Sequence, residues 1–227
     1  SLHHFLTPSP PSPPSPPSNF PLNIMVLKDF TTFAPTLKKR MINITLPDKS
    51  VRTYEAGVSG LEIAKSISEG LARNVLSVKV DDEVWDLNRP IMKDARIRLF
   101  TWNDPEGKAT VWHSSAHLMA EAVEALYPGT KFGIGPDIEQ GFYYDIDLGD
   151  RTISDADFKA IEDKMLELAR KDQKFERKAI SKADALEYFT KKQDKYKLEL
   201  IQDLNDGEIT PYQSGNFVDR CRGPHLP

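Results

Sequence analysis

The sequence contains very little cysteine and histidine, with one Cys and five His among 227 residues. A single cysteine excludes an internal disulfide framework and suits a reducing compartment. No run of 18 or more apolar residues occurs, which excludes an ordinary membrane-spanning helix. The N-terminus also lacks a basic region followed by an apolar one, so we expect no secretory signal and a cytoplasmic location. The net charge of −4 gives no overall electrostatic preference for nucleic acid, although a local basic surface is compatible with it.

Proline is concentrated in the first 40 residues, where "TPSPPSPPSPPSNFP" occupies positions 7–21. Each proline fixes φ and removes a backbone N–H, so this stretch is neither a helix nor a central strand. We expect residues 1–40 to form a disordered Pro/Ser-rich leader, with an SH3-type ligand as the alternative. His3 and His4 belong to this leader, and we do not count them as site residues.

A patterned region begins at Met41. The segments "MINITL" and "VRTYE" alternate around the turn "PDKS", which predicts a hairpin. The segment "SGLEIAKSISEGLA" has apolar residues at helical spacing and predicts a helix that ends near Gly70. Two further strands are predicted at "VLSVKV" and "IRLF". This order indicates a compact α+β module of the β-grasp type over residues 41–102.

Residues 41–101 resemble a TGS domain through "MINITLPDKSVRTYEAGVSGLEIAKSI", "VLSVKVDDEVWDLNRPI" and "IRLFT". TGS domains occur at the N-terminus of threonyl-tRNA synthetases and in some GTPases and stringent-response enzymes. The resemblance therefore implies a connection with RNA or the ribosome, and it implies no chemistry.

A second α+β domain is predicted for residues 103–227, after the polar linker "NDPEGK". It opens with a long amphipathic helix from about Gly107 to Tyr127, which Pro128 and Gly129 end. The remaining predicted elements are a strand at "GFYYDIDL", helices from Ser154, from Ser181 and over 194–205, an extended "KFERKAI" and a final strand at "NFVDRC".

Two ligand-type pairs stand out in this second domain. His113 and His117 are at i, i+4, so a helix places them on one face. Cys221 and His225 are also four residues apart, at a strand end and in a loop. Together they could form a Cys-His₃ zinc site, and every histidine outside the leader is used. The alternative is that both pairs are ordinary surface or half-buried residues.

Asp219 lies close to the second pair in sequence. On a strand, residues two apart share a face, so Phe217, Asp219 and Cys221 point the same way. A carboxylate at this place can orient a histidine or bind a substrate amine, and the alternative is a solvated aspartate.

A second resemblance covers residues 109–227. The segments "WHSSAHLMAEAVEALYPGTKFGIGPDIEQGFYYDIDL", "DKYKLELI" and "FVDRCRGPH" are similar, in this order, to the editing domain of bacterial-type threonyl-tRNA synthetases. Alanyl-tRNA synthetases share this type of editing domain but lack the TGS module. The resemblance implies hydrolysis of mischarged seryl-tRNA(Thr). Such editing is needed because serine lacks one methyl of threonine, which is worth only about 1–3 kcal/mol in a pocket.

The resemblance also implies roles for individual residues. The implied catalytic set is His113, His117, Cys221, His225, Lys197 and Asp219, and the implied substrate-binding set is Tyr144, Gly135 and Asp219. Local pattern alone predicts differently at two positions: Lys197 as a solvated helix lysine and Tyr144 as a core residue.

The implied mechanism is hydrolysis of the ester by a positioned water. We expect His113 to act as the general base or to hold the water, Asp219 to bind the aminoacyl amine, and Lys197 to position water or stabilise negative charge. A covalent intermediate on Cys221 is the alternative. Alanyl-type editing domains resemble zinc proteins, whereas the threonyl type is thought to work without tightly bound zinc. We therefore expect no obligatory metal, with His113, His117, Cys221 and His225 as the ligands if zinc binds.

The parts of a synthetase that would charge tRNA are not present in this sequence. The resemblance implies a parent threonine–tRNA ligase, an ATP-binding enzyme of protein biosynthesis that uses magnesium and a zinc in its catalytic core and forms a homodimer. We expect the chain to be a fragment that binds the acceptor end of tRNA(Thr), with an editing domain truncated at its C-terminus. Two alternatives stay open: a freestanding zinc-dependent trans-editing deacylase of the alanyl type, and a non-catalytic TGS module that binds RNA or regulates.

Overall fold

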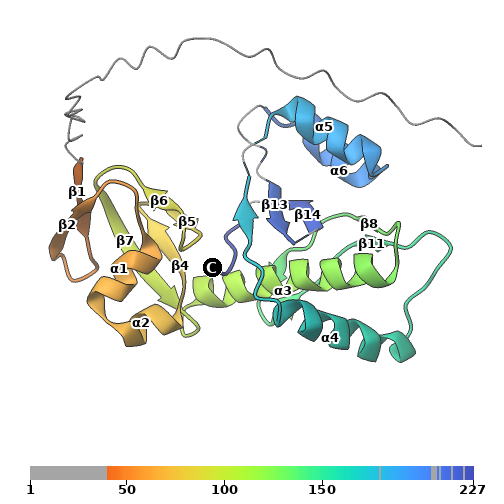
Figure 1. Cartoon of the computed structure of the whole chain (residues 1–227), viewed down its shortest axis with the longest axis horizontal. Helices are drawn as coiled ribbons and strands as arrows, with labels where there is room; N and C mark the ends of the chain where they lie inside the picture. Colours follow the sequence, from red (N-terminus) through yellow and green to blue (C-terminus); the bar gives the residue numbers. More distant parts are fainter. Residues whose placement is uncertain (1–39, 179, 206–208, 210, 216, 222) are drawn as a thin grey trace, which may run out of the picture. The chain divides into compact units, whose positions relative to one another are not determined.

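The structure is a computed structural model that describes residues 40–227 except 179, 206–208, 210, 216 and 222 (Figure 1). Of the leader predicted over residues 1–40, only Arg40 is among the described residues. Within the described part of the chain, no helix is long and apolar enough to cross a membrane.

The first half of the described chain is built on a five-stranded mixed sheet with the order β2-β1-β7-β4-β5. Parallel pairing joins β1 to β7, and the other neighbours are antiparallel. The strands are β1 (Met41–Thr45), β2 (Val51–Glu55), β4 (Val75–Val80), β5 (Glu83–Trp85) and β7 (Ala95–Thr101). A small antiparallel pair is formed by β3 (Val58–Ser59) and β6 (Pro90–Ile91). The predicted hairpin is confirmed, because β1 and β2 pair from Met41–Glu55 to Thr45–Val51.

Two short helices complete this half, α1 (Gly60–Ile67) and α2 (Glu69–Asn74). Ser59 begins α1 with a capping box, in which its hydroxyl accepts from the Glu62 N–H and the Glu62 carboxylate accepts from the Ser59 N–H. The prediction of one helix ending near Gly70 is wrong. Ser68 has an extended backbone and caps α2 through the Leu71 N–H, so the helix breaks there and Gly70 lies inside α2.

The core of this half is aliphatic. The buried set comprises Ile42, Ile44, Ile63, Ala64, Val75, Val78, Val80, Leu87, Ile91, Ala95 and Ile97. Alternate residues of β1 and one face of α1 contribute to it, as the period of two in a strand and the apolar face of a helix require. The prediction of an α+β fold is confirmed.

The second half is organised around α3 (Pro105–Leu126), the long helix drawn in green in Figure 1. It starts two residues earlier than its predicted beginning at Gly107, because Pro105 occupies the first turn, where a missing N–H costs nothing. The helix α4 (Asp155–Ala169) lies beside it and begins with a capping box at Ser154. The helices α5 (Lys182–Lys191) and α6 (Lys195–Gln202) form a separate pair, and Ser181 caps α5 as predicted.

The strands of this half are short. They form three groups: β8 (Lys131–Phe132) with β11 (Ile146–Asp147), β9 (Asp137–Ile138) with β10 (Gly141–Phe142), and β13 (Pro211–Ser214) between β12 (Glu176–Arg177) and β14 (Phe217–Arg220). The prediction of one strand at "GFYYDIDL" is only partly right, because β10 and β11 divide that segment between two pairs.

Two apolar clusters support these elements. One joins α3, α4 and β14 through Ala120, Val123, Phe132, Ile161 and Phe217. The other joins α5 to α6 through Ala185, Phe189, Ile201 and Ile209. The first cluster packs α3 against β14, and α6 contacts β8, which contributes Phe132 to that cluster. The elements α3, α6 and β14 supply predicted site residues.

Candidate functional site

The helix α3 presents His113 and His117 on one face, one turn apart. Their ring centroids are 4.9 Å apart, and the rings meet edge to face. His117 is 3% exposed, whereas His113 is only partly buried. The two residues are therefore placed by local helical geometry, as their spacing predicts.

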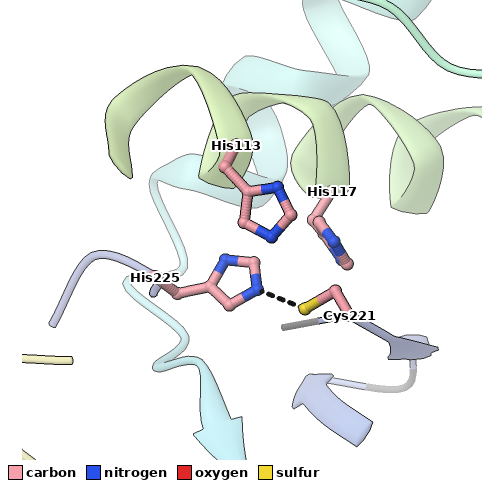
Figure 2. Close-up of side chains that lie close together, drawn as sticks. All are labelled: His113, His117, Cys221 and His225. Atoms are coloured by element: carbon pink, nitrogen blue, oxygen red, sulfur yellow. Dashed lines mark hydrogen bonds between the residues drawn. The ribbon is translucent and has the colours of Figure 1, made fainter. Parts of the chain in front are cut away.

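Cys221 and His225 approach this helix from the end of β14 and the segment after it (Figure 2). The His225 ring is 4.7 Å from the His113 ring and 4.6 Å from the His117 ring, between centroids. Its Nε2 lies 3.1 Å from the Cys221 Sγ. One ligand-type atom from each of the four residues lies within 4.8 Å of those of the other three. The structure thus brings together all four residues of the predicted cluster.

An ion pair lies next to the four-residue cluster. The Lys197 ammonium of α6 is 2.6 Å from Asp219 Oδ1 of β14, and the two side chains are 2% and 3% exposed. The ammonium also donates a hydrogen bond of 2.7 Å to the Gly133 carbonyl. The local-pattern prediction of a solvated Lys197 is therefore wrong, because α6 turns this lysine into the interior.

Tyr144 completes the carboxylate's surroundings. Its hydroxyl donates to Asp219 Oδ2, while its ring packs against Gly135, where any Cβ would overlap the ring. His117 Nδ1 lies 3.8 Å from the same carboxylate oxygen. Glycine at position 135 is thus required for the close approach of the tyrosine ring.

A cavity of about 400 Å³ opens beside these groups. Its lining includes His113, His117, Ile134, Gly135, Pro136, Tyr144, Lys197, Asp219, Arg220 and Cys221. All the predicted site residues except His225 line it. His225 lies behind the cavity wall, 1% exposed, and supports His113 and His117.

Burial determines the protonation states of the cluster. Desolvation lowers the pKa of His117 and of His225 well below the usual value, and the neighbouring imidazoles lower each further. It also lowers the pKa of His113, although the nearby carboxylates of Asp137 and Asp219 oppose this shift. All three imidazoles are therefore neutral at pH 7.

Cys221 is a thiol under the same conditions. Burial, followed by the charge of Asp219, raises its pKa far above the usual range. The protonated Sγ therefore donates to His225 Nε2, which assigns the ring proton of His225 to Nδ1, 3.4 Å from the Ser114 hydroxyl oxygen. A buried thiol of raised pKa is a poor nucleophile.

The cluster has the donor set for a zinc ion. Tetrahedral zinc with nitrogen and sulfur ligands needs donor atoms roughly 3.3–3.8 Å apart, a spacing that a small contraction of this cluster would reach. His113 Nε2 is buried and lacks a hydrogen-bond partner among the described residues, so it is available to a metal or a water. The ammonium of Lys197 also lines the cavity and repels a dication, although its ion pair with Asp219 offsets part of that repulsion.

The neutral histidines predict a pH-dependent stability. His117 and His225 are unprotonated in the folded protein, but they titrate near pH 6.5 when the chain is unfolded. Below about pH 6.5 the unfolded state binds more protons, so the free energy of unfolding falls as the pH falls. The limiting slope is about 1.4 kcal/mol per pH unit for each of the two buried rings. Urea unfolding between pH 7.5 and 5.5 measures it.

The matched comparison for this slope is the His117→Gln variant. The free energy of unfolding of this variant should change less steeply with pH, by up to about 1.4 kcal/mol per pH unit, because glutamine does not titrate. A wild-type protein whose stability is constant from pH 7.5 to 5.5 would contradict the assignment of neutral buried imidazoles.

Comparisons with known proteins agree with the sequence analysis. Residues 42–101 match the TGS domain family. The chain contains a TGS domain. Threonine–tRNA ligases match 82% of the chain, with 63% identity for the protein of Cytophaga hutchinsonii, 57% for that of Parabacteroides distasonis and 58% for that of Porphyromonas gingivalis. The predicted resemblance to bacterial threonyl-tRNA synthetases is confirmed. The chain spans 29% of the length of each of these relatives.

Some residues around the site were not predicted from the sequence. Phe175 stacks on the His225 ring at 4.3 Å, and Tyr212 meets it edge-on at 4.5 Å. Asp86 of the TGS domain accepts hydrogen bonds from the His225 N–H and the Tyr212 hydroxyl. No spacing signal points to Asp86, because 139 residues separate it from His225.

Proposed function

We propose that this chain is the editing portion of a threonine–tRNA ligase and hydrolyses seryl-tRNA(Thr) in the cavity beside His113. The observation that supports this most is the cavity itself, where a carboxylate, an ammonium and neutral imidazoles line a space of about 400 Å³. An aminoacyl ester presents an ammonium and a carbonyl, for which the Asp219 carboxylate and the Lys197 ammonium are matching groups. The parent enzyme would activate threonine with ATP and charge tRNA(Thr) in the cytoplasm.

Asp219 is the group that would hold the substrate's amine. Its carboxylate accepts from Lys197, from Tyr144 and from the Arg220 N–H, and a carboxylate has about four acceptor positions, so one is left for an ammonium ion. The same contacts hold it in one orientation. The aminoacyl group would thereby be fixed with its ester directed toward the histidines.

His113 is the group that would take a proton from the attacking water. It is neutral, it lines the cavity, and its Nε2 is buried and without a hydrogen-bond partner among the described side chains. His225 is less suited because its Nε2 is engaged with Cys221. The Lys197 ammonium would stabilise the negative charge that develops on the ester oxygen.

The raised pKa of Cys221 favours this water mechanism over a covalent one. A thiolate is the reactive form of cysteine, and burial disfavours it here. Cys221 instead donates to His225, and in the proposed mechanism it supports the imidazole cluster.

A deacylation assay tests the proposed function. The chain should release serine from seryl-tRNA(Thr) faster than buffer does. Threonyl-tRNA(Thr) is the control substrate and should be hydrolysed about 10- to 200-fold more slowly, the range that one methyl group allows. A chain that leaves seryl-tRNA(Thr) intact would contradict the proposal and would favour a non-catalytic TGS module that binds RNA.

The second candidate is a zinc-dependent deacylase of the alanyl type, which the Cys-His₃ donor set favours. When bound, zinc would be held by His113, His117, Cys221 and His225 and would supply a Lewis acid. Because the Cys221 proton must be lost and Lys197 repels a dication, we expect less than about 0.1 zinc per chain and chelator-resistant hydrolysis. Elemental analysis of protein expressed with added zinc decides the point. Stoichiometric zinc together with chelator-sensitive hydrolysis would favour this second candidate.

A further inference from the structure

The His225 ring is held by stacking and by contacts of its nitrogens with Cys221 and Ser114, and the backbone of its segment is held by two further hydrogen bonds. The ring stacks between His113 and Phe175, at 4.7 and 4.3 Å between centroids. The backbone N–H of His225 donates to Asp86 Oδ1 at 2.7 Å, and the N–H of Leu226 donates to Ser114 Oγ at 3.0 Å. The two backbone anchors therefore contribute, together with these ring contacts, to the position of the imidazole along the stack.

Asp86 links three parts of the molecule through one carboxylate. It follows β5 directly, in the TGS domain. While Oδ1 accepts from His225, Oδ2 accepts from the Tyr212 hydroxyl of β13 at 2.7 Å. Tyr212 is 3% exposed, and the edge of its ring meets His225. Hydrogen bonds to a charged carboxylate are shorter and stronger than those between neutral groups, and Asp86 makes two of them.

A second contact joins the TGS domain to α3, the helix that carries His113 and His117. Thr110 of α3 is 1% exposed, and its hydroxyl lies 2.9 Å from the Ser77 hydroxyl of β4, which is fully buried. The Thr110 carbonyl accepts from the Ser114 hydroxyl at 2.8 Å, and Ser114 is the second anchor of the His225 segment. At the start of α3, Gly107 packs so closely on the Thr101 backbone that no Cβ would fit there.

We propose that Asp86 is a positioning residue of the editing site, through which the TGS domain fixes the His225 imidazole against His113 and His117. Asp86 does not line the cavity and would not touch the substrate. Its effect passes through the His225 backbone and the Tyr212 ring. The catalytic consequence of this proposal rests on the proposed editing function, whereas the positioning itself does not.

The first test is NMR spectroscopy of the full chain with ¹⁵N-labelled histidine, in which only five side chains contribute signals. Wild-type His225 should show the neutral tautomer with its proton on Nδ1. Asp86→Ala should shift the ring resonances of His225 and His113. Asp86→Asn should restore most of the wild-type spectrum, because the asparagine oxygen still accepts from the His225 N–H. The matched control is Asp82→Ala, an exposed aspartate in the turn that precedes β5, and it should leave the spectrum unchanged.

The second test is the rate of seryl-tRNA(Thr) hydrolysis under single-turnover conditions. The hydrolysis rate of Asp86→Ala should fall by about tenfold or more, because small displacements of catalytic groups slow a reaction strongly. The rates of Asp86→Asn and Asp82→Ala should fall by less than about threefold. If Asp86→Ala does not fold, Tyr212→Phe replaces it, because it removes only the hydroxyl that bonds to Asp86 and should shift the His225 signals.

The outcomes separate this proposal from the proposed function. The positioning role would be overturned if the histidine resonances of Asp86→Ala were the same as those of the wild type, whatever the activity of that variant. If Asp86→Ala does not fold, the same criterion applies to Tyr212→Phe. A wild-type chain without deacylase activity would overturn the editing function, and the resonance comparison would still decide the role of Asp86.

Discussion

Replacing Asp219 with alanine is expected to lower the free energy of unfolding by about 3–5 kcal/mol. The change leaves the Lys197 ammonium, which is 2% exposed, without its counter-ion and with the Gly133 carbonyl as an acceptor. It also removes the acceptor of the buried Tyr144 hydroxyl. Urea unfolding at pH 7.5 measures the loss. Under the proposed function the same variant should also lose deacylation, because Asp219 is the group proposed to bind the substrate's amine.

Two comparisons sharpen this expectation. The pair Lys159–Asp163 on α4 has the same chemistry but is exposed, at 79% and 59%, so Asp163→Ala should cost less than about 1 kcal/mol. The double variant Lys197→Met/Asp219→Ala should cost less than the sum of its single changes, because each single change leaves one buried charge unpaired whereas the double variant leaves none. A loss below about 1 kcal/mol for Asp219→Ala would contradict the buried ion pair.

Replacing His113 with alanine is expected to reduce the hydrolysis of seryl-tRNA(Thr) by about 10²- to 10⁴-fold, the usual contribution of a general base. The reason is that His113 is a neutral imidazole on the cavity wall, whose buried Nε2 has no hydrogen-bond partner in the part of the chain that the structure describes. Single-turnover release of serine measures the rate. Stability should change little in comparison, because the His113 side chain is only partly buried.

Cys221→Ser is the matched control for the mechanism. Serine keeps a hydroxyl that can donate to His225, so a water mechanism should retain activity within about tenfold, while a covalent thioester route should lose it. Equal hydrolysis by the wild type and His113→Ala would rule out His113 as the base. Detection of an acyl group bound to Cys221 would show that the thiol is the nucleophile.

Resemblance and local pattern differed in what they predicted at the site. Pattern alone gives a solvated Lys197, because the segment "DKYKLEL" is mostly polar. The resemblance to threonyl-tRNA synthetases predicts a site lysine, and the ammonium does lie beside Asp219. The interior direction of Lys197 follows from the packing of α6 through Ile201, which a local reading of charge does not reveal.

The sequence by itself determined the features that depend on neighbours along the chain. The i, i+4 spacing places His113 and His117 on one helix face, and strand alternation places Phe217, Asp219 and Cys221 on one side of β14. Caps at Ser154 and Ser181 begin their helices as their residue types predict. These are local rules of backbone geometry, so a single sequence is enough to apply them.

Only the tertiary structure decided which distant groups meet. The Lys197 ammonium pairs with Asp219, and the Asp86 carboxylate joins His225 from 139 residues away. Burial, in turn, makes the imidazoles neutral and keeps Cys221 a thiol. The physical reason is that desolvation and pairing depend on what surrounds a group in space, and that environment exists only after α3, α6, β14 and the TGS sheet have packed together.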